Sequence, residues 1–138
     1  MSNSWVADRE TTIYSKVKAK LTSKFIKTYP DINITQDGKK IVDPKFPNIF
    51  ISFLQPVEQG KDLEGKTINA VLLTMQIDVS VSRAMGMTVA NEVSWAIVDI
   101  LKDMGFEASM PYFSSDMEEV YRSIARYSRV IGYNDTIE

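Results

Sequence analysis

The chain has 138 residues, 44% of them hydrophobic and 25% charged, with a formal net charge of −2. This composition suits one globular domain with a core of its own, and it disfavours a protein that wraps nucleic acid, which needs a basic face. The sequence contains neither cysteine nor histidine, so it offers no thiolate ligand and no imidazole as general base or metal ligand, and this disfavours an enzyme.

The first predicted element is a helix over residues 8–28. Its apolar face repeats every four residues, at Ile13, Val17, Leu21 and Phe25. Pro30 is expected to stop the helix, because a proline disfavours the helical conformation in the residue before it.

Four lysines form a second stripe on this helix: Lys16, Lys20, Lys24 and Lys27. The stripe can be an anion-binding face. It can also be a solvated surface on which long aliphatic stems cover apolar edges, and we favour this second interpretation.

Two short strands are predicted next, over residues 32–34 and 49–54, with a turn at Asp37–Gly38 between them. The second strand is apolar on both faces, which indicates a central strand or one whose second face meets another subunit. Residues 55–66 are polar and contain two glycines, so we expect a long loop that is either idle or a contact arm.

The rest of the chain is organised around residues 67–105. Apolar side chains occupy the odd positions from Val71 to Val81, while the even positions become polar, a period of two that predicts a strand with one face on a core. The period then changes to that of a helix, with Thr88 as N-cap and Gly105 beyond the C-terminus. The helical stripe consists of Val89, Val93, Ala96, Ile97, Ile100, Leu101 and Met104.

Two further strands close the chain. Residues 106–113 are expected to form an edge strand, because Pro111 cannot donate a hydrogen bond to a neighbour, and residues 114–119 an acidic turn. The last strand is predicted over residues 120–131. One of its faces consists of Tyr121, Ser123, Ala125, Tyr127 and Ile131. Val120, Arg122, Ile124, Arg126 and Val130 lie on the other.

These elements predict a single α+β domain, a mixed, mainly antiparallel sheet with two main helices packed on it. We expect residues 8–132 to form its core and residues 133–138 a flexible C-terminal tail. The sequence shows no apolar run long enough to span a bilayer and no secretory signal pattern.

The chemical motifs of enzymes and cofactor sites are not found. No phosphate-binding glycine loop follows a strand, and no serine lies in a nucleophile-elbow pattern. Asp99 and Asp103 stand one helical turn apart and could share a divalent ion, but carboxylates on an outer helix face are usually solvated. We therefore expect no catalytic residue, no metal and no cofactor.

Several short features follow one another along the chain. They are Tyr29–Pro30 after the first helix, the start of a strand at Phe46–Ile51, the long strand over 69–81, Met104–Gly105–Phe106 after the second helix, and Arg126–Tyr127 near the end. In this order the chain resembles the tail terminator (tail-completion) proteins of tailed bacteriophages, over residues 8–132.

The resemblance implies a structural virion protein. Such proteins form a ring, typically hexameric, on the head-proximal end of the tail tube, stop its growth and provide the surface that joins the head. The partners implied are copies of the chain, the tail tube protein and the connector or neck proteins, with genome DNA passing through the ring without sequence-specific binding. The implied location is the tail or neck of a virion assembled in the host cytoplasm, without a membrane.

Arginine and tyrosine are favoured at interfaces, so we expect the last strand to contact a neighbouring subunit. Its candidate interface residues are Arg122, Arg126, Arg129, Tyr121 and Tyr127. The 55–66 segment supplies further candidates: Glu58, Lys61, Asp62 and Glu64. Two alternatives are a head-side neck or head-completion protein, and an anion- or nucleic-acid-binding module that uses the lysine stripe.

Overall fold

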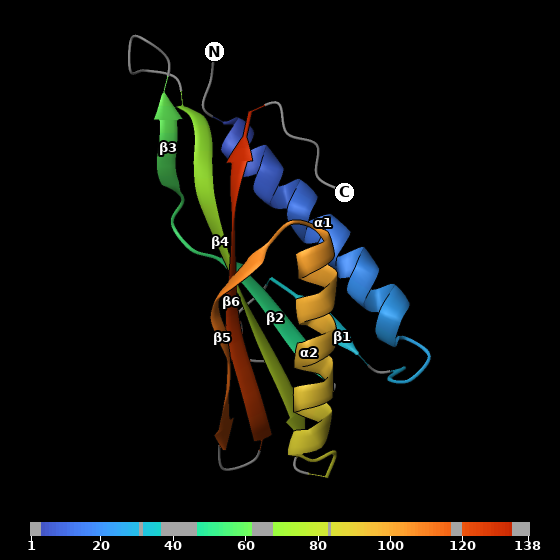
Figure 1. Cartoon of the computed structure of the whole chain (residues 1–138). Coiled ribbons are helices and arrows are strands. Elements are labelled where there is room, and N and C mark those ends of the chain that lie inside the picture. The colour runs from blue at the N-terminus through green and yellow to red at the C-terminus, as the bar shows by residue number, and fades with distance from the viewer. Residues whose placement is uncertain are drawn as a thin grey trace.

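The computed structural model describes residues 4–30, 32–36, 47–61, 68–82, 84–116 and 120–133. Within these residues the chain forms two helices and six strands (Figure 1). Their order is α1 (Trp5–Phe25), β1 (Asn33–Thr35), β2 (Asn48–Phe53), β3 (Val57–Lys61), β4 (Ile68–Ser82), α2 (Met87–Asp103), β5 (Glu107–Asp116) and β6 (Val120–Gly132).

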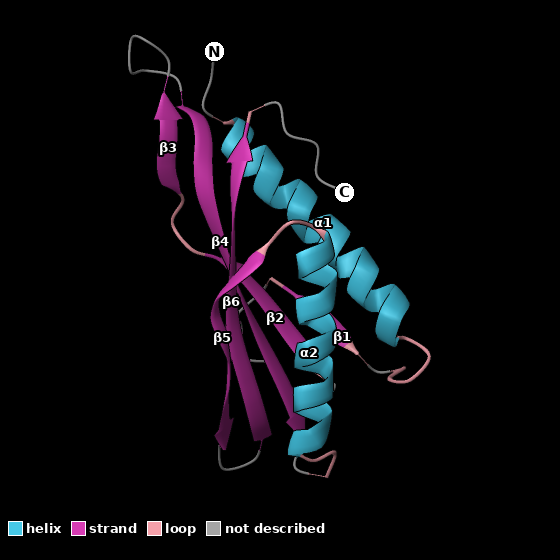
Figure 2. Cartoon of the chain, viewed as in Figure 1, coloured by secondary structure: helices cyan, strands magenta, loops and turns pink. Residues whose placement is uncertain are grey.

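The strands form one sheet in the order β1-β2-β4-β6-β5, with β3 also paired to β4. The β1–β2 pair is parallel and every other pair is antiparallel, and β4 and β6 are the long central strands (Figure 2). This arrangement confirms the predicted α+β class with a mixed, mainly antiparallel sheet. It also confirms that the 49–54 segment is a central strand, since β2 lies between β1 and β4.

Both helices pack on the same face of the sheet. The odd-numbered side chains of β4 from Val71 to Val81 are all buried, as the alternation predicted, and they share one core with α1 and α2. From α1 that core takes Ile13, Val17, Leu21 and Phe25, the four residues of the predicted apolar face, together with Trp5.

The buried side of α2 is turned slightly from the predicted stripe. Ala90, Ser94 and Val98 are buried with Val93, Ile97 and Leu101, whereas Val89, Ala96 and Ile100 are only partly buried. The hydroxyl of Ser94 donates to that of Ser123 on β6 at 2.7 Å, so a buried polar pair fixes the helix against the sheet.

The ends of α2 are set by two glycines. Gly86, with φ +88°, is the N-cap residue, so the predicted cap by Thr88 is wrong: Thr88 is already inside the helix. Gly105 has φ +87°, which confirms the predicted left-handed residue after the helix.

The segment predicted as a loop over 55–66 is partly a strand. β2 pairs with residues 75–80 of β4, and β3 continues along the same edge by pairing with residues 68–72. Phe53 pairs with Met75 and Val57 pairs with Leu72, so three residues (54–56) between β2 and β3 lie opposite two residues of β4 (73 and 74). The β2–β3 connection therefore has one extra residue, as in a β-bulge. Residues 62–67 and the predicted turn at Asp37–Gly38 lie outside the described residues.

Other boundaries also differ from the prediction, and α1 begins and ends three residues earlier than the predicted 8–28. β5 continues to Asp116, so residues 114–116 are strand and not an acidic turn, while 117–119 are not among the described residues. At the C-terminus, Tyr133 is held and is not part of a flexible tail: its amide donates to Asn69 O (2.9 Å), its carbonyl accepts from Arg9, and its ring meets Trp5 edge-on at 5.7 Å.

Candidate assembly surface

The sheet has a second face, which neither helix covers. We call it the open face, and the strand registers place on it the even-numbered side chains of β2, β4 and β6 together with Val57. Its described side chains include Phe50, Ser52, Val57, Leu72, Thr74, Gln76, Asp78, Ser80, Arg122, Ile124, Arg126, Ser128 and Val130. The surface takes side chains from four paired strands, β2, β3, β4 and β6, so hydrogen-bonded strand backbone positions it.

A chain of polar contacts runs along the open face between β4 and β6. Arg126 Nε donates to Gln76 Oε1 at 3.0 Å, and Gln76 Nε2 donates to Asp78 Oδ1 at 3.1 Å. The other carboxylate oxygen of Asp78 is paired with Arg122. The network satisfies Asp78, which is 5% exposed, and it leaves the exposed guanidinium of Arg126 at one end.

An apolar row crosses the sheet beside this network. Val57, Leu72 and Val130 are register partners on β3, β4 and β6. Val57 and Val130 are 54% and 50% exposed, which places them among the most exposed large apolar side chains in the described chain. Exposed valines on strand backbone, on the same face as an exposed arginine, are suited to contact with another protein.

The structure divides the predicted interface residues of the last strand between the two faces. Arg122 and Arg126 lie on the open face, whereas Tyr121, Tyr127 and Arg129 lie on the side of the helices. The expectation that the arginines and tyrosines form one mixed surface is therefore corrected. Their separation follows from the alternation of a strand, in which 127 and 129 point away from 126.

The residues on the helix side make contacts within the chain itself. Tyr127 is 1% exposed in the core, and burial raises its pKa well above the ordinary value. Tyr121 packs against the same core. Arg129 donates to the carbonyl of Met104 at 2.8 Å, so its cation satisfies the C-terminus of α2.

The predicted residues of the 55–66 segment are placed only in part. Glu58 lies on β3 opposite Val71 and is exposed, and Lys61 ends β3 opposite Ile68. Asp62 and Glu64 lie outside the described residues.

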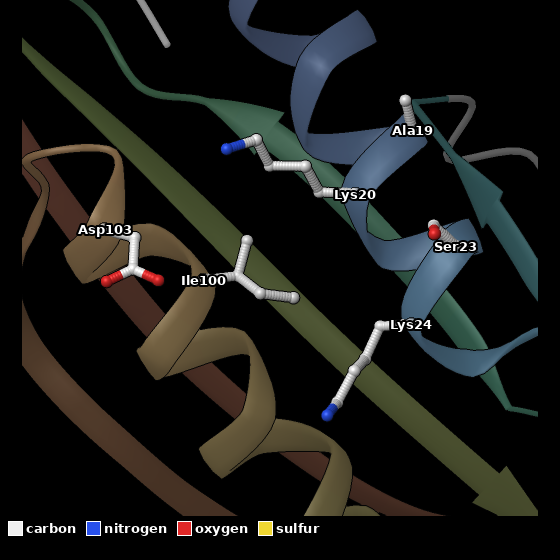
Figure 3. Close-up of a pocket in the computed structure, with 6 residues that line it drawn as sticks. All are labelled: Ala19, Lys20, Ser23, Lys24, Ile100 and Asp103. Atoms are coloured by element: carbon white, nitrogen blue, oxygen red, sulfur yellow. The ribbon is translucent and has the colours of Figure 1, made fainter.

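The lysine stripe borders a groove between the two helices. Lys20 and Lys24 extend from α1 toward α2, which contributes Ile100 and Asp103 to an open groove of about 610 Å³ (Figure 3). Asp99 and Asp103 are both exposed, and no cluster of metal-ligating side chains occurs among the described residues. The groove brings two ammonium groups together with the apolar side chain of Ile100 and the carboxylate of Asp103.

The sequence did not indicate Gln76 and Asp78 as site residues. In the structure Gln76 accepts a hydrogen bond from Arg126, and Asp78 forms an ion pair with Arg122. Their alternation along β4 was visible in the sequence, but only the β4–β6 register shows that positions 76 and 78 lie opposite 126 and 124.

The sequence matches no protein-family model and no curated protein. In the part of the chain that the structure describes, neither helix has the length and apolar character needed to cross a membrane.

Proposed function

We propose that this chain is a non-enzymatic structural subunit that assembles into a closed, typically six-membered ring on the head-proximal end of a bacteriophage tail tube. In this role it stops tube growth and offers the surface to which the head connector or neck proteins bind. It acts in the tail or neck of the virion, after assembly in the host cytoplasm, and DNA passes through the ring without sequence-specific contacts.

The observation that carries this proposal is the open face of the sheet. The two helices cover one face of the sheet, and the other face carries Val57, Val130 and Arg126 as exposed side chains. This second face is suited to burial against another chain. The order of elements agrees with the resemblance to tail terminator proteins. The absence of cysteine and histidine agrees with a structural role.

The test compares two variants that each place a carboxylate on an exposed apolar position. Val130→Asp, on the open face, should reduce the native mass from a ring to smaller species. Ile26→Asp, at the C-terminal end of α1 and 43% exposed, should leave the ring unchanged. Light scattering after size exclusion gives the mass, and circular dichroism confirms that both variants fold. If Val130→Asp still forms the ring, the open face is not part of the contact between chains.

A head-side neck protein is the alternative within the same setting, and the binding partner separates the two. A tail terminator ring binds the end of purified tube and limits its length, whereas a head-side protein binds the connector and leaves the tube free to grow. Tube length in the presence and absence of the chain, measured by electron microscopy, decides between them.

The groove of Lys20 and Lys24 favours a second candidate, an anion- or nucleic-acid-binding module. This candidate predicts a monomer that binds DNA with an affinity that falls steeply with salt, because each phosphate contact releases counterions. Lys20→Glu combined with Lys24→Glu would then abolish binding. The proposed ring retains its mass in that double variant.

A further inference from the structure

The outer side of α2 carries an exposed tryptophan between two carboxylates. Glu92, Trp95 and Asp99 follow at i, i+3 and i+7, so they share one side of the helix. All three are exposed, Trp95 by 56%, whereas Val93, Ile97 and Leu101 point into the sheet. We call this side, from Thr88 to Asp99, the outer α2 face.

The outer α2 face and the open face lie on opposite sides of the subunit. The helices form one layer and the sheet the other, so one surface points away from the helix layer and the other away from the sheet (Figure 1). A surface on the helix layer of one copy cannot reach the open face of the same copy. It can reach the open face of the next copy.

The two surfaces are complementary in charge and in apolar content. Glu92 and Asp99 bring two negative charges to either side of the indole. Among the described side chains of the open face, Arg122 is paired with Asp78, and Arg126 is an exposed cation that a partner can reach. Glu107, exposed at the start of β5 opposite Ser128, adds a negative charge to the same face between the positions of Arg126 and Val130.

The apolar parts match as well. Val130 follows Arg126 on the same side of β6, and Val57 and Leu72 continue the row across the sheet. An indole buries a large apolar area with few rotatable bonds, and tryptophan and arginine are the residue types that contribute most often to the centre of an interface. Arg126 lies four residues from Val130 on β6, so with Trp95 on the valine row a carboxylate one turn away along α2 can extend toward the arginine.

We propose that the open face of one copy binds the outer α2 face of a second copy, with Trp95 on Val130 and the carboxylates of Glu92 and Asp99 directed at Arg126. The contact is heterologous: each copy uses one surface on each neighbour, and a rotation that closes the set gives a ring. This inference rests on the proposed ring function and names the two surfaces that form the ring.

The first experiment reverses the charges. Arg126→Glu alone and Asp99→Lys alone each place like charges across the contact, and each should lower the mass to that of a monomer. The double variant Arg126→Glu/Asp99→Lys restores one opposite-charge pair, between positions 126 and 99, while Glu92 still faces a like charge at position 126, so it should recover part of the wild-type ring. Lys20→Glu, a charge reversal on the exposed side of α1, is the control and should leave the ring intact.

The second experiment mixes two variants that each lose a different surface. Arg126→Glu retains a native outer α2 face, and Trp95→Ala retains a native open face. An equimolar mixture should therefore give a species of twice the monomer mass and no ring, because only one native contact can form. Glu92→Lys, which alters the same helix face, should behave as Trp95→Ala does. Circular dichroism shows that the separate variants are folded.

The outcomes separate this inference from the proposed function. A wild-type ring that survives both single charge reversals overturns the helix-on-sheet contact and leaves the ring function standing. Monomeric single variants that neither recover in the double variant nor pair on mixing also overturn it. A wild-type chain that is monomeric overturns the contact and the ring function together.

Discussion

Ile97 shows how single residues hold α2 on the sheet. Its side chain is 1% exposed at the centre of the buried helix side. Ile97→Ala should lower the free energy of unfolding by roughly 2–5 kcal/mol, through lost apolar transfer and the cavity that remains. Ile26→Ala is the matched control, since this isoleucine is 43% exposed, and it should change stability by about 0.5 kcal/mol or less. Urea unfolding of both variants checks the prediction, and an unchanged midpoint for Ile97→Ala would show that α2 does not pack as described.

Two arginines on the same strand should differ in what their loss affects. Arg129→Met removes the hydrogen bond to Met104 O and the cation at the C-terminus of α2, at a cost of about 1–2 kcal/mol. Arg126→Met removes an exposed cation and should leave the stability of the monomer almost unchanged while weakening assembly. Denaturation and light scattering on each variant separate the two effects. Equal stability losses would contradict the assignment of the two residues to different faces.

The buried phenol of Tyr127 should make the stability of the fold depend on pH in the alkaline range. Burial raises the pKa of Tyr127 from its ordinary value of about 10. Above pH 10 the unfolded chain therefore releases a phenol proton that the folded chain keeps, so stability present below pH 10 is lost as pH rises. Ionisation of Tyr127 should lower the free energy of unfolding by up to about 1.4 kcal/mol for each pH unit above 10.

Tyr127→Phe should reduce the fall in unfolding free energy between about pH 10 and 12, measured by denaturant titration at each pH. Tyr133→Phe, at a ring that is 38% exposed, is the control. A Tyr127→Phe variant with the full wild-type slope would mean that other groups dominate the alkaline transition.

At the residue scale, the sequence predicted burial better than it predicted the site. The alternation of the last strand correctly placed Tyr127 with Ala125 and Ile131, yet Tyr127 and Arg129 were also proposed as interface surface. The same alternation places both residues on the helix side of the strand, where Tyr127 is buried in the core. The partners of Arg122 and Arg126 depend on the β4–β6 register, which pairs residues about 50 positions apart and leaves no local pattern.

At the scale of elements, strong periodicity identified α1, β4, α2 and β6, and the weakest element was missed. β3 (Val57–Lys61) includes a glycine and has no run of β-branched residues, so its local sequence favours a loop. It is a strand because β4 extends beyond β2 and offers unpaired backbone groups to the next segment. Pairing with a long neighbour outweighed local propensity.

This pairing changes what a shortened 55–66 segment should do. Replacing residues 62–67 by Asn-Gly keeps the Lys61–Ile68 pair and supplies a two-residue turn, so the chain should remain as stable as the wild type. Replacing residues 55–66 by the same turn removes β3 and its hydrogen bonds to β4, and it should cost more than about 1 kcal/mol.

Hydrogen exchange locates the effect of the two deletions. Faster exchange at residues 68–72 of β4 is expected only in the longer deletion, because those residues pair with β3. If the longer deletion leaves both stability and exchange unchanged, β3 contributes nothing to the fold.

At the scale of the whole molecule, the architecture followed from the amphipathic pattern and the assembly did not. A strand and a helix with one apolar side each require a second layer, and the chain supplies it with α1, α2 and six strands in the described part. Which outer surfaces could contact another chain is not encoded in that periodicity. The open face and the outer α2 face became visible only when exposed side chains from separate strands and from α2 were placed in space.

The central claim is that the chain forms a closed ring. The most direct measurement is the native mass of the wild-type protein, by light scattering after size exclusion, with negative-stain images of the same peak. We predict a mass close to six times the 15.6 kDa of one chain, independent of dilution through the micromolar range, and annular particles. A single species of 15.6 kDa throughout that range, with no annular particles, would contradict the account.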